Sequence, residues 1–273
     1  TRTDMNKLLN IFDKSFDKKV KFRTIAYLFL LIPIILLWIF SEYQNILFSV
    51  TLILLIGSLF FNLQDANTEL KETKDEIINK MADLIEFKDS NTGGHVKRVS
   101  QYTRLLASLH NELNKEQIEL LAKASPLHDI GKISIPDSIL NKPEKLTKDE
   151  WEIMKTHSEK GYEIFKDSKK DYLILAATIA KEHHEKWDGS GYPNQLKEEE
   201  ISIQARITAI ADVFDALSCE RPYKKEKKKK KIFKIIEEEK NKHFDPKLVD
   251  LFLHNKEKFL SIKKGTYQKG KSL

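Results

Sequence analysis

The sequence predicts an all-α protein in which a two-helix transmembrane hairpin and a linker helix precede a helical bundle. Two uncharged apolar runs lie near the start of the 273-residue chain, and later apolar residues recur at helical spacing. Strand signals are nearly absent, and Gly and Pro gather between the expected helices. We expect four parts: an N-terminal segment (1–23), two transmembrane helices (24–61), a linker helix (62–80) and the bundle (81–273).

The two apolar runs, residues 24–40 and 46–61, are each near the lower limit of length for crossing a bilayer. Aromatic residues near their ends suit the membrane interface, and Pro33 is tolerated in a membrane helix. Lys and Arg precede the first run and follow the second, whereas the turn between the runs has neither. This asymmetry predicts that both ends of the hairpin are cytoplasmic. A buried soluble hairpin is the alternative, and a cleaved signal peptide fits poorly because no small-residue cleavage site follows the first run.

Residues 62–80 lack Gly and Pro and should form a helix. An apolar residue recurs at every seventh position, namely Leu63, Leu70, Ile77 and Leu84, although the companion heptad positions are poor. We expect a linker helix that could pair two protomers and carry a movement to the bundle. A stiff spacer is the alternative.

Helical apolar faces continue through the bundle region. They lie at residues 96–109, from residue 118, at 151–154, at 173–180 and at 203–217. Turn residues punctuate the segments between them, as at Ile135-Pro136 and Asp188-Gly189. This order predicts a bundle in which side chains from several helices meet in one cleft.

Charge and cysteine content narrow the functional classes. The net charge of +6 comes partly from a lysine-rich run at residues 224–231, which opens a helix at 232–236. We interpret that run as a solvated helix face rather than a surface for a nucleic acid polymer or anionic lipid. The single cysteine, Cys219, excludes an internal disulfide and fits a reducing compartment, and we assign it no role.

Histidine and aspartate are arranged as in a metal site. Asp129 directly follows His128, and the pair His183-His184 comes later in the chain. A carboxylate beside an imidazole can bridge two cations, and a water held between two cations becomes a nucleophile near neutral pH. Further ligands are available from separate helices at His95, His157 and Asp212. Any one of these histidines could instead be an ordinary core or surface residue, but five of the eight histidines lie in polar motifs punctuated by glycine.

An ordered series of motifs surrounds these residues: Thr92-Gly93-Gly94-His95, His128-Asp129-Ile130-Gly131-Lys132, His183-His184-Glu185, Asp188-Gly189-Ser190-Gly191-Tyr192-Pro193, Ala211-Asp212-Val213-Phe214-Asp215 and Arg221-Pro222-Tyr223-Lys224. In these motifs the chain resembles the HD-GYP family, bacterial metal-dependent phosphodiesterases that open cyclic di-GMP. The resemblance runs from about Met81 to about Phe259.

The resemblance implies two metal ions that share Asp129. One would be held by His95, His128, Asp129 and Asp212, and the other by Asp129, His157, His183 and His184. Mixed imidazole and carboxylate ligands suit iron or manganese and are compatible with zinc. Family members that hold three metals commonly have a glutamate four residues before the first histidine, where this chain has Asn91. A neutral amide is a poorer ligand for a hard cation, so we expect two ions.

The resemblance also implies roles at the substrate. Lys132 would lie near the scissile phosphate and, with Asp129, belong to the catalytic set, because a cation there offsets developing charge. Asp215, Arg221 and Lys224 would grip or frame the dinucleotide phosphates, together with Lys132. The loop Gly191-Tyr192-Pro193 would shape the site and could bind a protein partner.

We therefore expect a multi-pass protein of the inner (cytoplasmic) membrane whose bundle lies in the cytoplasm. There it would hydrolyse cyclic di-GMP to linear pGpG, GMP or both. One alternative keeps the metal site and changes the substrate to another cyclic dinucleotide or a nucleotide phosphate. The other is a non-catalytic membrane scaffold that uses the bundle to bind partners.

Overall fold

The computed structural model describes residues 25, 27, 29–34, 44–88, 94–218 and 229–265. Within these ranges the regular elements are α-helices and short 3-10 helices, and the β-type pairing is an isolated bridge between Lys240 and Phe244. The prediction of an all-α fold is therefore confirmed. Most of the first apolar run lies outside the described residues, as do Asn91, Cys219, Arg221 and Lys224.

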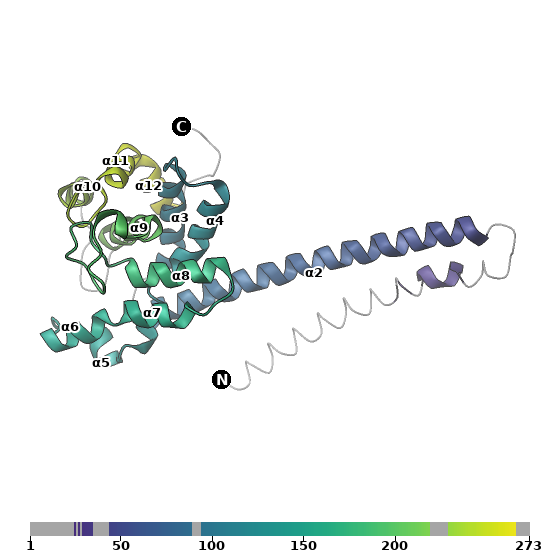
Figure 1. Cartoon of the computed structure of the whole chain (residues 1–273), viewed down its shortest axis with the longest axis horizontal. Coiled ribbons are helices and arrows are strands. Elements are labelled where there is room, and N and C mark those ends of the chain that lie inside the picture. Colours follow the sequence, from purple (N-terminus) through teal and green to yellow (C-terminus); the bar gives the residue numbers. More distant parts are fainter. Residues whose placement is uncertain are drawn as a thin grey trace. The chain divides into compact units, whose positions relative to one another are not determined.

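The chain divides into two compact units, Thr1–Asp75 and Glu76–Leu273, and the boundary falls inside the long helix α2 (Gln44–Lys88). The second apolar run and the predicted linker are thus one uninterrupted helix (Figure 1). Within the described residues, α2 is the one helix long and apolar enough to cross a membrane. In the first unit, Asn62 of α2, the residue after the second apolar run, donates to the hydroxyl of Tyr27 in the first run at 3.1 Å. The two-helix membrane hairpin stays a prediction.

The second unit is a bundle of short helices (Figure 1). After the end of α2 the elements are α3 (His95–Ser108), α4 (Lys115–Ala124), η1 (Ser125–Leu127), η2 (Ile130–Ser134), α5 (Asp137–Leu140), α6 (Lys148–Lys155), α7 (His157–Phe165), α8 (Asp171–Glu182), η3 (Glu198–Glu200), α9 (Ile203–Ser218), α10 (Lys229–Glu238), α11 (Pro246–His254) and α12 (Lys256–Lys263).

Side-chain caps fix where several of these helices begin. Asn114 accepts from the backbone N–H of Gln117 at the start of α4, and Thr147 accepts from that of Glu150 at the start of α6. In both cases the side chain of Gln117 or Glu150 accepts from the backbone N–H of the capping residue. Each pair therefore satisfies two backbone donors that the start of a helix leaves without partners.

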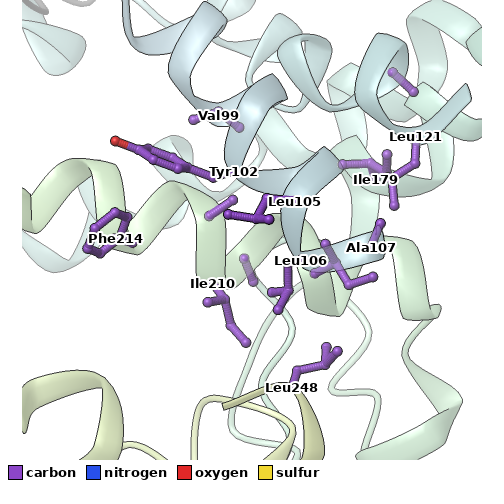
Figure 2. Close-up of a cluster of buried hydrophobic side chains, with 14 of the residues drawn as sticks. Val99, Tyr102, Leu105, Leu106, Ala107, Leu121, Ile179, Ile210, Phe214 and Leu248 are labelled. Carbon is purple, nitrogen blue, oxygen red and sulfur yellow. The ribbon is translucent and has the colours of Figure 1, made fainter. Parts of the chain in front are cut away.

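The core is built around α3. Figure 2 shows Val99, Tyr102, Leu105 and Leu106 of α3 meeting Ile179 of α8, Ile210 and Phe214 of α9, and Leu248 of α11. Tyr102 packs edge-on against Phe214 with ring centroids 5.0 Å apart. Because these residues are essentially inaccessible to water, their burial is the main force that fixes α3 relative to α8 and α9. Those three helices provide or lead directly to four of the predicted metal ligands.

Two glycines set how closely η2 packs on α7. A Cβ added at Gly131 would collide with the backbone of His157 and Gly161, and one added at Gly161 would lie 2.9 Å from the Cβ of Ala180. The absence of side chains at these positions lets the turn that carries Lys132 lie against the first turn of α7, where His157 stands.

Gly131→Ala should therefore destabilise the bundle. The methyl group would meet backbone atoms that cannot move without displacing α7, so we expect a loss of about 1–3 kcal/mol in the free energy of unfolding. Thermal unfolding followed by circular dichroism measures this. Gly57→Ala is the matched control, because a Cβ there meets nothing within 4 Å. Equal melting temperatures for Gly131→Ala and the unmodified protein would contradict the steric argument.

Candidate metal centre

All seven predicted metal ligands come together in the second unit. His95 is the first residue of α3, His128 and Asp129 lie between η1 and η2, and His157 is the first residue of α7. His183 and His184 directly follow α8, and Asp212 lies in α9. They form two groups, and within each group the candidate ligand atoms all lie within 4.8 Å of one another. The first group is His95, His128 and Asp212, and the second group is Asp129, His157, His183 and His184.

The two oxygens of Asp129 face different groups. Oδ1 lies 3.5 Å from His157 Nε2 and 3.6 Å from His183 Nε2. Oδ2 lies 3.3 Å from His128 Nε2, which in turn is 3.9 Å from Asp212 Oδ1. The carboxylate therefore stands between the two groups, in the position that a bridging ligand needs.

The histidine rings are oriented through their other nitrogen. Nδ1 of His128 lies 2.8 Å from the carbonyl of Ser125, and Nδ1 of His157 lies 2.8 Å from that of Met154. Nδ1 of His183 lies 3.0 Å from the carbonyl of Ala180. Since a carbonyl oxygen only accepts, each Nδ1 must carry a proton, so the electron pair of the neutral ring is on Nε2 and is directed into the site. This is the tautomer that a metal ligand requires.

The electrostatics of the site favour bound cations. His128 Nε2 and Asp129 Oδ1 are buried and form no hydrogen bond within the described residues. Such atoms are costly to bury unless something positive binds them. Burial raises the pKa of Asp129, but Lys132 and His128 outweigh burial and hold that pKa well below its usual range. The carboxylate is therefore ionised, and the residues present fit divalent cations.

The imidazoles differ in charge for physical reasons. Burial lowers the pKa of His157 to about 4 and holds the pKa of His184 well below its usual range, so both rings are neutral, as metal ligands must be. At His128 burial acts in the same direction, but the carboxylates of Asp129 and Asp212 outweigh it and raise the pKa to about 9. Without a metal, this part of the site binds a proton in place of a cation.

Lys132 lies at the site, as the sequence predicted for a residue one turn after Asp129. Its Nζ is 2.8 Å from Asp129 Oδ2. The turn itself is a 3-10 helix, η2, rather than a continuation of an α-helix. The ammonium group therefore stands beside the carboxylate shared by the two groups, within reach of a phosphate bound there.

The structure places Asp215, which the resemblance expects to grip or frame the substrate phosphates, beside His95. It is 2 % exposed, and its Oδ2 accepts from His95 Nδ1 at 2.8 Å. Arg98 donates to both oxygens, from Nε to Oδ1 at 2.7 Å and from Nη2 to Oδ2 at 3.0 Å. Burial raises the pKa of Asp215, but the bonds from His95 and Arg98 prevail and lower it. The side chain points to the back of a ligand ring, so the structure gives it an orienting role.

Arg98 is a site residue that the sequence analysis missed. It lies one helical turn after His95 on α3, and Asp215 lies one turn after Asp212 on α9. Residues three apart on a helix lie on one face, so this spacing could have indicated that Arg98 and Asp215 face the same site as His95 and Asp212. The contact joins the two helices that carry ligands of the first group.

The loop around Gly191-Tyr192-Pro193 forms a wall of the second group. Tyr192 stacks on His184 with centroids 4.8 Å apart. The buried Glu185 carboxylate accepts from the backbone N–H of Asn194 at 2.6 Å and of Leu196 at 3.0 Å, which ties the loop down. Burial raises the pKa of Tyr192, so its phenol is neutral. These contacts are compatible with the expected role of the loop in shaping the site. Binding of a protein partner by the loop stays a prediction. The expected phosphate contacts of Arg221 and Lys224 lie outside the described residues.

Comparison with known proteins points to one family. A family model described as "HD domain" matches residues 79–248. The 3'3'-cGAMP-specific phosphodiesterase 2 of Vibrio cholerae is 46% identical over 208 residues, covering 76% of this chain and 40% of that protein. The cyclic di-GMP phosphodiesterase response regulator RpfG of Xanthomonas campestris is 41% identical over 188 residues, covering 69% of this chain and 50% of that protein. A cyclic di-GMP phosphodiesterase of Thermotoga maritima is 43% identical over 188 residues, covering 68% and 50%.

Each of these relatives is longer than the part that the chain matches, since the chain spans half of their length or less. Among solved structures, that of the cyclic GMP-AMP specific phosphodiesterase V-cGAP3 from V. cholerae matches with a TM-score of 0.54 at 20% identity, covering 71% of this chain and 51% of that one. At this identity the match shows a shared fold.

Asp215→Asn should weaken metal binding. An amide cannot accept the His95 proton and both Arg98 bonds as a carboxylate does, so the His95 ring loses its fixed orientation. We expect a fall in affinity of about 10-fold to 100-fold for the ion bound by His95, as for other partners that orient a ligand. Titration of the metal-free protein with Mn²⁺ measures it.

Asp250→Asn is the control, because Asp250 forms an exposed ion pair with Lys240 far from the ligands in sequence. A variant that bound Mn²⁺ normally but required more substrate would restore the phosphate-contact hypothesis for Asp215.

Proposed function

This chain belongs to the HD domain family, and from that premise we propose that it is a metal-dependent phosphodiesterase that hydrolyses a cyclic dinucleotide. The named relatives, at 41–46% identity, support a more specific place in the HD-GYP family. A non-catalytic scaffold is less well supported, because such a protein has no need to keep a complete ligand set with a lysine beside it.

One observation carries the proposal, namely the two groups of ligands that meet at the Asp129 carboxylate. His95, His128 and Asp212 with one Asp129 oxygen could hold one ion, and His157, His183 and His184 with the other oxygen could hold a second. Divalent ions at these places would supply charge neutralisation for a phosphodiester and activation of a water molecule. The ligand chemistry fits iron or manganese.

The chain's own residues supply orientation and a fixed positive charge. Backbone carbonyls bonded to Nδ1 of His128, His157 and His183 fix the orientation of the three imidazole rings before a metal or substrate binds. Lys132 places an ammonium beside Asp129, where it can offset the charge that develops on a phosphate oxygen and on the departing ribose oxygen. The ring of Tyr192 stacks on His184 and so covers one side of this ligand ring.

For the substrate we propose cyclic di-GMP, opened to linear pGpG, GMP or both. Several relatives bear this activity in their names. 3'3'-cGAMP is the second candidate, because a relative at 46% identity is named for it. The two substrates differ in one base, whereas the ligand groups and Lys132 are suited to the phosphodiester that both share. Base-contacting residues therefore decide between them.

Lys132→Met should separate catalysis from binding. Methionine keeps most of the apolar stem and removes the charge, so metal content and substrate affinity should change little. Turnover should fall by about 100-fold or more, the range for losing one charge-stabilising group. Product formation by the metal-loaded full chain is measured by chromatography, with cyclic di-GMP and 3'3'-cGAMP supplied separately.

Lys145→Met is the matched control, because Lys145 is exposed in the loop before α6. Unchanged turnover in Lys132→Met would remove the role assigned to this lysine. If the unmodified protein cleaved only 3'3'-cGAMP, the reaction class would stand and cyclic di-GMP would not be the substrate.

We also propose that the protein sits in the inner membrane with the second unit in the cytoplasm. Support comes from the two apolar runs and from the placement of Lys and Arg at both ends of the pair. The length and apolar composition of α2 agree with this placement. Cyclic dinucleotides would then meet the site in the compartment where such messengers act.

A reporter enzyme that works only outside the cytoplasm tests this topology. It should be inactive when fused after Leu84 and active when inserted between Glu42 and Gln44, because the cations flank the pair on both sides. A fully soluble protein after cell fractionation, or the opposite reporter pattern, would rule out the proposed arrangement.

A further inference from the structure

The last turn of α2 contacts a metal ligand through Glu86. This side chain is 6 % exposed, and its oxygens accept from the backbone N–H of His95 at 3.0 Å and of Val96 at 3.4 Å. These are the first two residues of α3, whose N-cap Gly94 has no side chain to satisfy them. A carboxylate at this end also interacts favourably with the helix dipole. Glu86 therefore caps α3 from another helix, at the residue where the first ligand stands.

Two residues further on, Lys88 contacts the turn that carries Lys132. Its Nζ donates to the carbonyls of Ile133 and Ile135, both at 3.0 Å, and lies 3.4 Å from the carbonyl of Lys132. Lys88 also pairs with Asp137 at 3.3 Å. One ammonium thus gathers the carbonyls at the end of η2, of which that of Lys132 also accepts from the backbone N–H of Ile135 at 3.0 Å.

The same turn of α2 is anchored by apolar packing. Ala82 and Ile85 are buried in the core of the second unit. With Glu86 they line a narrow cavity that also reaches His95, Asp129 and Lys132. In addition, Asn141, the residue after α5, donates to the carbonyl of Lys88 at 3.1 Å and so fixes the end of α2.

We propose that Glu86 and Lys88 are positioning residues, which hold His95 and Lys132 at the separation that the reaction needs. Neither is a metal ligand. Glu86 acts through the first turn of α3, and Lys88 acts through the backbone of η2, so the two should affect different properties. Loss of Glu86 should weaken metal binding by the His95 group, whereas loss of Lys88 should displace Lys132 and leave metal binding intact. The kinetic part of this proposal rests on the proposed function, and the metal-binding part does not.

The experiment uses the full chain with Glu86→Ala, Glu86→Gln, Lys88→Met and Lys88→Arg. Glu86→Ala should raise the dissociation constant for one of two Mn²⁺ ions by about 10-fold or more, the range for partners that orient a ligand. Glu86→Gln keeps one acceptor for the His95 N–H and should recover part of this loss. Glu76→Ala is the control, because Glu76 is exposed on the same helix.

Lys88→Met should bind both Mn²⁺ ions within about twofold of the unmodified protein, while kcat per metal-loaded chain falls about 10-fold and KM is unchanged, as expected when a transition-state interaction is lost. Lys88→Arg, which can still donate to several carbonyls, should restore most of the rate. Lys80→Met is the control on the exposed face of α2.

Several results would overturn the proposal. Normal Mn²⁺ affinity in Glu86→Ala would show that the cap does not position His95. A merely structural role would give a different result. Every variant would then lose affinity for both Mn²⁺ ions, melting temperature and activity to the same extent, and Glu86→Gln and Lys88→Arg would recover none of these losses. If the unmodified protein cleaved no cyclic dinucleotide, the proposed function would fail, while the Mn²⁺ titrations of the Glu86 variants would still decide their part.

Discussion

A single carboxylate organises the site, because Asp129 presents one oxygen to each group of ligands. Everything around it follows from keeping that negative charge ionised in a partly buried place. His128 and Lys132 hold its pKa down, and His157 and His184 on the other side are neutral because burial lowers the pKa of both rings. A region with carboxylates, neutral rings and unpaired buried atoms is poorly stable alone. Divalent ions bound there would resolve this imbalance, and the fold brings residues of five segments together around the place where such ions would bind.

The support for these ligands comes from different sources. Core packing of α3 on α8 and α9 fixes the helix ends, and the close contact at Gly131 fixes the Lys132 turn against α7. Carbonyl oxygens then select the ring nitrogen that faces the site. The contacts made by Arg98, Glu86 and Lys88 add a further layer that joins segments distant in sequence. The geometry of the centre thus depends on tertiary packing as much as on the ligand residues themselves.

The sequence predicted the helical class, the main helical faces and the ligand set, because periodicity and motif spacing are local properties. It predicted a helix over the second apolar run followed by a linker helix, and the structure has both within the single helix α2. The direction of Asp215 was not predictable, since a face of α9 is visible in the sequence but its partner is not. Arg98 stands 117 residues from that carboxylate. Glu86 and Lys88 were missed for the same reason, because they act through backbone groups, which carry no residue-specific signal.

The hydrogen bonds behind the imidazoles have a consequence for how metal and fold depend on each other. Three rings are held by the backbone and a fourth by Asp215, so the ligands are arranged without help from the ion. In small zinc domains the metal creates the fold, and a chelator unfolds them. Here the large apolar core sets the fold, so removal of bound ions by a chelator would leave the bundle folded. The centre is thus preorganised, and any divalent ion that suits these ligands would bind a site whose geometry is already set.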